Sequence, residues 1–172
     1  RAPSWQTDVE VGIEQVKRLC RHRQEEMLAD LHLIIADAKY GNHRFLAPLR
    51  AEPCGALVRM RRDRVLYGAP GTYTGRGRPR VHGDRFAFKE PETWGAPDAL
   101  AELEHPRWGK VRLRRWDDKH ARQDADTSFS VILVEAHLER EKPSAPFWLG
   151  YQPPPHQKAQ DQRLEDLWHW YE

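Results

Sequence analysis

The sequence has little cysteine, no long hydrophobic run and almost no net charge. The two cysteines, Cys20 and Cys54, are too few for a disulfide scaffold, so we expect reduced thiols. The longest apolar runs, 33–36 and 131–134, are far shorter than the ~20 residues that span a bilayer, so we expect no membrane helix. With 172 residues, 39% hydrophobic and 31% charged, the chain is typical of one compact domain.

Several catalytic motifs are also absent. The sequence holds no Gly-x-Ser-x-Gly elbow, no phosphate-binding Gly-Lys-Ser/Thr loop and no Gly-x-Gly-x-x-Gly motif after a strand. Its nine histidines form no i, i+4 pair and join no Cys-x-x-Cys motif, which argues against a zinc site. These absences disfavour acyl hydrolases, P-loop enzymes and Rossmann oxidoreductases.

The formal net charge of +2 hides two blocks of opposite sign. Residues 90–106 carry five acids and no lysine or arginine, whereas residues 56–80 carry seven arginines against one acid. Arginine binds phosphates and base edges in bidentate fashion, so the basic block predicts a surface for an anionic polymer. A GC-rich genome would also favour arginine over lysine. The seven arginines are Arg59, Arg61, Arg62, Arg64, Arg76, Arg78 and Arg80.

The first third of the chain reads as an α/β unit. Residues 7–29 form an amphipathic helix pattern that opens on a capping box, Thr7-x-x-Glu10. Residues 31–36 predict a buried, parallel strand, residues 43–49 a short helix interrupted by Pro48, and residues 56–62 a second strand. The order helix, strand, helix, strand is typical of the α/β class.

The pattern changes after residue 63. Residues 68–83 are rich in glycine, proline and arginine and predict a loop. Four segments, 85–88, 110–116, 129–137 and 147–151, predict strands, and the proline run 153–155 ends this region. Residues 159–172 return to helical spacing, with Leu164, Leu167, Trp168 and Tyr171 on one face. We therefore expect a β-rich insertion within an α/β fold.

Asp37 is the sharpest candidate for chemistry, because it directly follows the apolar strand 31–36. Functional groups in open α/β sheets gather at the carboxyl ends of strands, and a carboxylate there is well placed to hold Mg²⁺. The alternative is that Asp37 caps the turn that follows. One carboxylate does not make a two-metal site, which needs acids from several elements.

Two weaker signals point to nucleic acid. The segment Arg76-Gly77-Arg78-Pro79 has the form of an AT-hook, whose arginines would enter a narrow minor groove; a loop that contacts phosphates explains it equally well. Tryptophans lie among basic residues in the insertion, where Trp148 could stack an unpaired base. The alternative, that these rings form the core of the β-rich unit, is favoured.

Several runs together resemble the catalytic domain of DDE-type insertion-sequence transposases. LIIADAKYGNHRFLAPL, residues 33–49, is similar to the segment around that family's second catalytic aspartate. The stretch 57–86, with WGAPD at 94–98 and WGKVRLRRW at 108–116, resembles the insertion of one bacterial branch. The closing DLWHWYE, residues 166–172, is similar to the approach to a Tyr-x2-Arg-x3-Glu signature.

The resemblance implies a ribonuclease-H-like α/β core interrupted by a β-rich insertion between the second aspartate and the glutamate. The core portion would cover residues 1–62, the insertion 63–155, and the start of the returning helix 156–172. The first aspartate would then precede Arg1, and the signature arginine and glutamate would follow Glu172 by two and six positions. We expect this fragment alone to lack tight Mg²⁺ binding and DNA cleavage.

The resemblance also implies roles and partners. The parent enzyme would use Mg²⁺ or Mn²⁺ to cut a DNA strand and transfer it to target DNA, with Asp37 as a catalytic metal ligand and Tyr171 against the DNA backbone. Its partners would be transposon-end and target DNA and a second copy of itself, in the bacterial cytoplasm near the nucleoid. The alternatives are a non-catalytic, arginine-rich DNA-binding module and a generic α/β domain without a nucleic-acid role.

Overall fold

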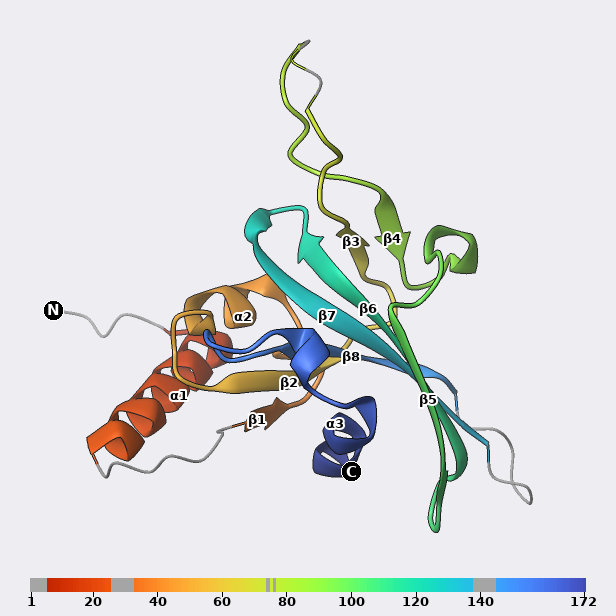
Figure 1. The fold of residues 1–172 in the computed structure, drawn as a ribbon. Coiled ribbons are helices and arrows are strands. Elements are labelled where there is room, and N and C mark those ends of the chain that lie inside the picture. Colours follow the sequence, from red (N-terminus) through yellow and green to blue (C-terminus); the bar gives the residue numbers. More distant parts are fainter. Residues whose placement is uncertain (1–5, 26–32, 74, 76, 138–144) are drawn as a thin grey trace, which may run out of the picture.

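The computed structural model describes residues 6–25, 33–73, 75, 77–137 and 145–172 (Figure 1). Its helices are α1 (Asp8–Glu25), α2 (His43–Leu49) and α3 (Leu164–Tyr171), with short 3-10 turns η1 (Pro91–Thr93) and η2 (Ala159–Asp161). The strands are β1 (Leu33–Ala36), β2 (Gly55–Met60), β3 (Val65–Tyr67), β4 (Arg85–Ala87), β5 (Ala99–His105), β6 (Gly109–Ala121), β7 (Asp124–His137) and β8 (Phe147–Gln152).

All eight strands belong to one mixed sheet. Its order is β1-β2-β8-β7-β6-β3-β4, and β5 pairs with β6 outside this path. The β1–β2 pair is parallel and joined through α2, while the other pairs are antiparallel. The fold is therefore mixed α/β and rich in strands. Strand β8 pairs with β2, so the strands after residue 63 continue the sheet that β1 and β2 begin.

The two faces of the sheet carry separate cores. Helices α1 and α2 cover one face, where Val58 and Leu46 are fully buried. Helix α3 covers the other face and buries Leu164, Leu167 and Trp168, as their helical spacing predicts. The sheet is thus sandwiched between helices from the two ends of the chain (Figure 1).

The first helix begins where its sequence predicts. The Thr7 backbone N–H donates to Glu10 Oε2 at 2.6 Å, and the Glu10 backbone N–H donates to Thr7 Oγ1 at 3.3 Å, which completes the capping box. The bonds that the Thr7 backbone N–H and the Thr7 hydroxyl donate to the Glu10 carboxylate lower the pKa of Glu10. The predicted helical residues 26–29 lie outside the described part. No described helix is long and apolar enough to cross a membrane.

The expectation that the first strand is buried is wrong in part. Strand β1 is parallel to β2 as predicted, but it lies at the edge of the sheet and Ile35 is 46% exposed. Its apolar run packs on one side while the other side has no neighbouring strand among the described residues. Strands β3 and β5 were not anticipated, because β3 is short and the residues of β5 belong to the acidic block. Residues 31–32 lie outside the described part.

The base-stacking role for Trp148 is also wrong in this fold. Trp148 is 3% exposed and stacks on Phe88 with ring centroids 4.1 Å apart. Trp94, Trp116 and Phe86 surround the same ring. A base cannot reach a ring whose faces and edges are packed by other aromatic side chains, so these tryptophans build the core.

Candidate functional site

Asp37 lies one residue beyond the carboxyl end of β1 and is exposed to solvent. Its Oδ1 accepts a hydrogen bond from the Lys39 backbone N–H at 2.9 Å, so the carboxylate also shapes the turn that follows. Lys39 in turn forms an ion pair with Asp8 on α1. Both interpretations of Asp37 therefore fit the same geometry: it caps a turn and presents a carboxylate at a strand end.

The Tyr40-Gly41-Asn42 motif fixes this turn against its neighbours. The Tyr40 ring packs against Phe45, with centroids 4.9 Å apart, and lies so close to Gly12 of α1 that a side chain there would collide with it. A side chain at Gly41 would collide more severely still, because it would meet the backbone carbonyl oxygen of Arg59 on β2. Asn42 precedes α2, and its Nδ2 donates to the Lys39 carbonyl at 2.9 Å rather than capping the helix.

Arg59 and Tyr171, two residues assigned to DNA from the sequence, lie together. Arg59 Nη1 donates to the Tyr171 hydroxyl at 3.4 Å, and the guanidinium lies 3.9 Å from the centroid of the Phe147 ring. Tyr171 also packs against Phe147. Ala36 pairs with Val58, so the next residues, Asp37 and Arg59, occupy adjacent positions where the parallel strands end. Helix α3 therefore brings Tyr171 to the end of the sheet that carries Asp37.

More arginines follow on the segment that leaves β2. Arg61 and Arg62 are exposed and line a hollow of about 420 Å³ with Asp63 and Lys89, and Arg61 Nη2 lies 3.0 Å from Asp63 Oδ2. Arg64 is half-buried, and burial lowers its pKa. This segment connects β2 to β3, so its basic side chains run from the Asp37 end of the sheet toward the far strands.

Arg78 and Arg80 lie on an arm, formed by the described residues of 68–84, between β3 and β4. Its base is closed where the Gly68 N–H donates to the Asp84 carbonyl and the Gly83 N–H donates to the Gly68 carbonyl, both at 2.9 Å. Arg78 and Arg80 are exposed, and the arm projects far from the sheet (Figure 1). Arg76 lies outside the described residues.

Two groups of candidates therefore emerge. Arg59 and Tyr171 are in contact near the end of β2, and Asp37 follows the neighbouring strand at the position next to Arg59. Arg61 and Arg62 follow directly after β2. Arg78 and Arg80 are separated from them, because β3 and β4 stand at the opposite side of the strand order from β1. Phe147, whose ring packs against the Arg59 guanidinium, was not predicted from the sequence. The pairing of β8 with β2 that brings the two residues together is a long-range contact without a local signal.

The described residues do not complete a metal centre. No group of three or more histidine, cysteine, aspartate or glutamate side chains in the described part could hold a metal ion. Asp37 supplies one carboxylate with the oxygen chemistry that Mg²⁺ prefers, and a full coordination sphere would need further ligands.

Comparison with protein families decides the classification. The model of the DDE superfamily endonuclease family matches residues 6–122. The chain belongs to this family. The match runs from α1 through β6. It therefore includes Asp37, the turn that follows Asp37 and the arm of this DDE endonuclease chain. Tyr171 lies beyond the match. No curated protein matches the sequence.

Family membership confirms the resemblance drawn from the sequence. DDE endonucleases act on DNA, and nucleases of the superfamily generally use divalent metal ions. A nuclease or transposase type of function is therefore supported for the family to which this chain belongs.

Proposed function

We propose that the chain is a segment of a DNA transposase catalytic domain, in which Asp37 is one ligand of the catalytic metal. The complete domain would cleave a DNA strand and transfer its end to target DNA with Mg²⁺ or Mn²⁺. The observation that carries the proposal is the placement of Asp37 beside the Arg59–Tyr171 pair, at adjacent strand positions at one end of the sheet, within a chain of the DDE family.

Each of these residues has a separate task in the proposal. Asp37 keeps one oxygen for the turn and offers its carboxylate to a shared metal ion. Arg59 is held by Phe147 and by the Tyr171 hydroxyl, so its guanidinium is positioned before DNA arrives. A prepositioned arginine loses less side-chain entropy when it binds a phosphate than a free one does. Tyr171 would lie against the DNA backbone near the cut.

The insertion would supply DNA contacts away from the metal. Arg61, Arg62 and Arg64 would follow the backbone from the metal end, and the arm would reach further DNA through Arg76, Arg78 and Arg80. The domain boundaries at residues 62 and 155, a homodimer in the parent protein and a bacterial, nucleoid-associated location remain parts of this proposal. The division describes the order along the sequence, since the strands themselves share one sheet.

A second candidate is a non-catalytic, arginine-rich DNA-binding module. The exposed Arg78 and Arg80 on a projecting arm favour it, because they could bind phosphates without any metal. The two functions differ in whether Asp37 matters: the module would bind DNA equally well without its carboxylate.

The test is strand cleavage by the protein encoded by the whole reading frame. We expect cleavage of labelled DNA with Mg²⁺, and its loss in Asp37→Asn. The asparagine keeps an oxygen for the Lys39 N–H, so the turn survives while the charge is removed. Glu14→Gln, which neutralises an exposed acid on α1, is the control and should cleave normally.

The 172-residue chain by itself should not nick DNA, because its described residues supply one metal-binding carboxylate at this site. Nicking by this chain that requires Mg²⁺ and disappears in Asp37→Ala would overturn the proposed fragment. A cleaving full-length protein that tolerates Asp37→Asn would remove Asp37 from the metal site.

A further inference from the structure

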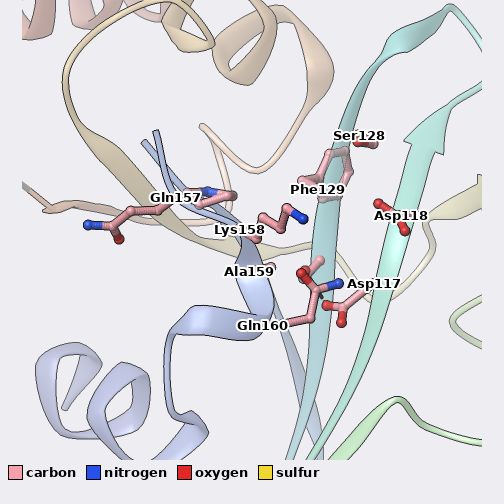
Figure 2. A pocket seen from close by; sticks show the side chains of 10 residues that line it. Asp117, Asp118, Ser128, Phe129, Gln157, Lys158, Ala159 and Gln160 are labelled. Atoms are coloured by element: carbon pink, nitrogen blue, oxygen red, sulfur yellow. Dashed lines mark hydrogen bonds between the residues drawn. The ribbon is translucent and has the colours of Figure 1, made fainter. Parts of the chain in front are cut away.

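A polar pocket of about 600 Å³ opens at the end of the sheet opposite to Asp37. It lies between the part of the β6–β7 hairpin nearer its turn and the segment that leads from β8 into η2 (Figure 2). Gln152, at the end of β8, pairs with Ala56 near the start of β2, whereas Asp37 follows the parallel strand at its other end. The residues that line the pocket are Asp117, Asp118, Ser128, Phe129, Ser130, Pro153, Gln157, Lys158, Ala159 and Gln160.

Asp117 in this pocket is a buried carboxylate of which only one oxygen has a hydrogen-bond donor in the described part of the chain. The residue is 6% exposed. Its Oδ1 accepts a hydrogen bond from Ser130 Oγ at 2.5 Å and lies 3.0 Å from Arg115 Nε. Its Oδ2 is buried and has no hydrogen-bond donor among the described residues. An unsatisfied buried oxygen costs about 1–3 kcal/mol, and more when it is charged, so this atom favours a ligand that brings a donor.

A β-bulge adds a second carboxylate to the same pocket. The pairing of β6 with β7 shifts register between Trp116 and Lys119, and Asp118 within the shift has a φ of 52°. In a regular strand, successive side chains point to opposite faces. The bulge breaks this alternation, so both Asp117 and Asp118 line the pocket (Figure 2). Asp118 is exposed at the mouth, whereas Asp117 forms the floor.

The fixed charge of Asp117 is already shared with Arg115. The Arg115 guanidinium is 5% exposed, and its Nη1 donates to the carbonyls of Ala159 and Gln162 at 3.0 Å. These bonds lock Arg115 to the η2 segment, so it cannot turn to cover the open oxygen of Asp117. Lys158 stands on the opposite wall of the pocket, with its ammonium directed across the opening (Figure 2).

The Asp117 Oδ2, unpaired within the described part, and the size of the pocket favour an organic N–H donor over a metal ion. Asp117 and Asp118 are two carboxylates without a third acidic, histidine or cysteine partner among the described residues, and a hard metal ion needs more fixed ligands. A planar guanidinium or a tetrahedral ammonium group, in contrast, needs only one or two hydrogen-bond acceptors around its charged end. The amide of Gln160, which lies beside Asp117, and the hydroxyl of Ser128 can bind a neutral polar body behind that charged end (Figure 2).

We propose that this pocket binds a guanidinium or primary ammonium group, which donates to Asp117 Oδ2 and is attracted by Asp118. The group can belong to a small amine or to a basic side chain of a polypeptide, since both present the same donors. The site is separate from the Asp37 end of the sheet, so the proposal does not depend on strand cleavage.

The experiment titrates the 172-residue chain with butylguanidinium and follows binding by calorimetry and by amide shifts around Asp117. Tetramethylammonium is the reference, because it carries the same charge and donates no hydrogen bond. We expect butylguanidinium to bind about ten-fold more tightly than tetramethylammonium, since charge-assisted hydrogen bonds are the stronger ones. Acetyl-arginine amide distinguishes the sources: its binding supports a polypeptide side chain, and its exclusion supports a small amine.

Asp118→Asn tests the site without damaging the fold. Asparagine tolerates the left-handed backbone at this position better than most residues do, and the substitution removes only the charge. Affinity for butylguanidinium should fall about ten-fold. Asp126→Asn, which neutralises an exposed acid outside the pocket, should leave affinity unchanged. Absent binding, equal binding of both cations or equal loss in the two variants would overturn the proposal, provided thermal melting shows both variants folded.

Discussion

Gly41 shows how a single residue holds the candidate site together. Its backbone packs directly against the Arg59 carbonyl. The turn that carries Asp37 is therefore in close contact with strand β2, which carries Arg59. A methyl group at this position would collide with main-chain atoms, which cannot swing aside as a flexible side chain can. Because this close contact leaves no room for a side chain, position 41 of the Tyr40-Gly41-Asn42 motif requires glycine.

Gly41→Ala should therefore destabilise the protein. Overpacking costs about 1–3 kcal/mol. For a chain of this size, that lowers the melting temperature by about 2–12 °C. Gly71→Ala is a matched control, because a methyl group there would meet no atom within 4 Å and should leave the melting temperature unchanged. Circular dichroism melts of both variants measure the difference, and equal melting temperatures would contradict the contact.

Individual residues also show which features could be predicted from the sequence and which could not. Asp37 could be located because an apolar run and a turn are local signals. The core position of Trp148 could only be weighed as an alternative, because its partners Phe88, Trp94 and Trp116 come from distant segments. The pocket at Asp117 and Asp118 had no signal at all, since a bulge depends on how two strands pair.

Among the structural elements, the arm between β3 and β4 is expected to bind DNA. Replacing Arg78 and Arg80 together by alanine should weaken DNA binding. Each lost phosphate contact should reduce the slope of log affinity against log salt by about one. Arg18→Ala with Arg21→Ala, two exposed arginines on α1, is the control pair. Fluorescence anisotropy at several salt concentrations measures both; equal losses would show that the arm is not a specific contact.

A pair of histidines lies at the base of the same arm, with His82 on the arm and His120 on β6. His82 Nδ1 lies 2.9 Å from His120 Nε2, and both rings lie near Tyr67. Burial, and then the neighbouring His82, lowers the pKa of His120 below its usual value of 6.5, with a smaller opposing effect of Asp124. A hydrogen bond between the two rings requires that at least one imidazole is neutral, because a protonated imidazole has no acceptor nitrogen.

The pair should make stability fall in mild acid. Below the unfolded pKa of about 6.5, the unfolded chain takes up a proton at His120 more readily than the folded chain does, so unfolding is favoured as pH falls. The melting temperature should therefore drop between a pH of about 7.5 and about 5.5, and less so in His120→Gln. His156→Gln, at an exposed position, is the control. The same pH response in the wild type and His120→Gln would exclude this pair as the cause.

For the whole molecule, the mixed α/β class and the helix-strand-helix-strand opening followed from local periodicity. The boundaries of α2 agree with the prediction, and β2 differs from it by one or two residues. The strand order could not be read from the sequence. Strand β8 stands between β2 and β7, and its place depends on pairing with residues far away along the chain. The partial exposure of β1 was not predicted from its apolar run, because such a run does not reveal how many neighbours a strand has.

The place of β8 has a consequence for how the protein is made. During synthesis β2 emerges long before its partner, because Met60 must wait for Trp148 to leave the ribosome. At about 5–20 residues per second, the nascent chain spends several seconds with β1 and β2 exposed as a two-stranded edge. Its apolar strands are open to wrong pairing for that time, so a chaperone that binds nascent chains should raise the yield of folded protein more than it would for a fold built from local pairs.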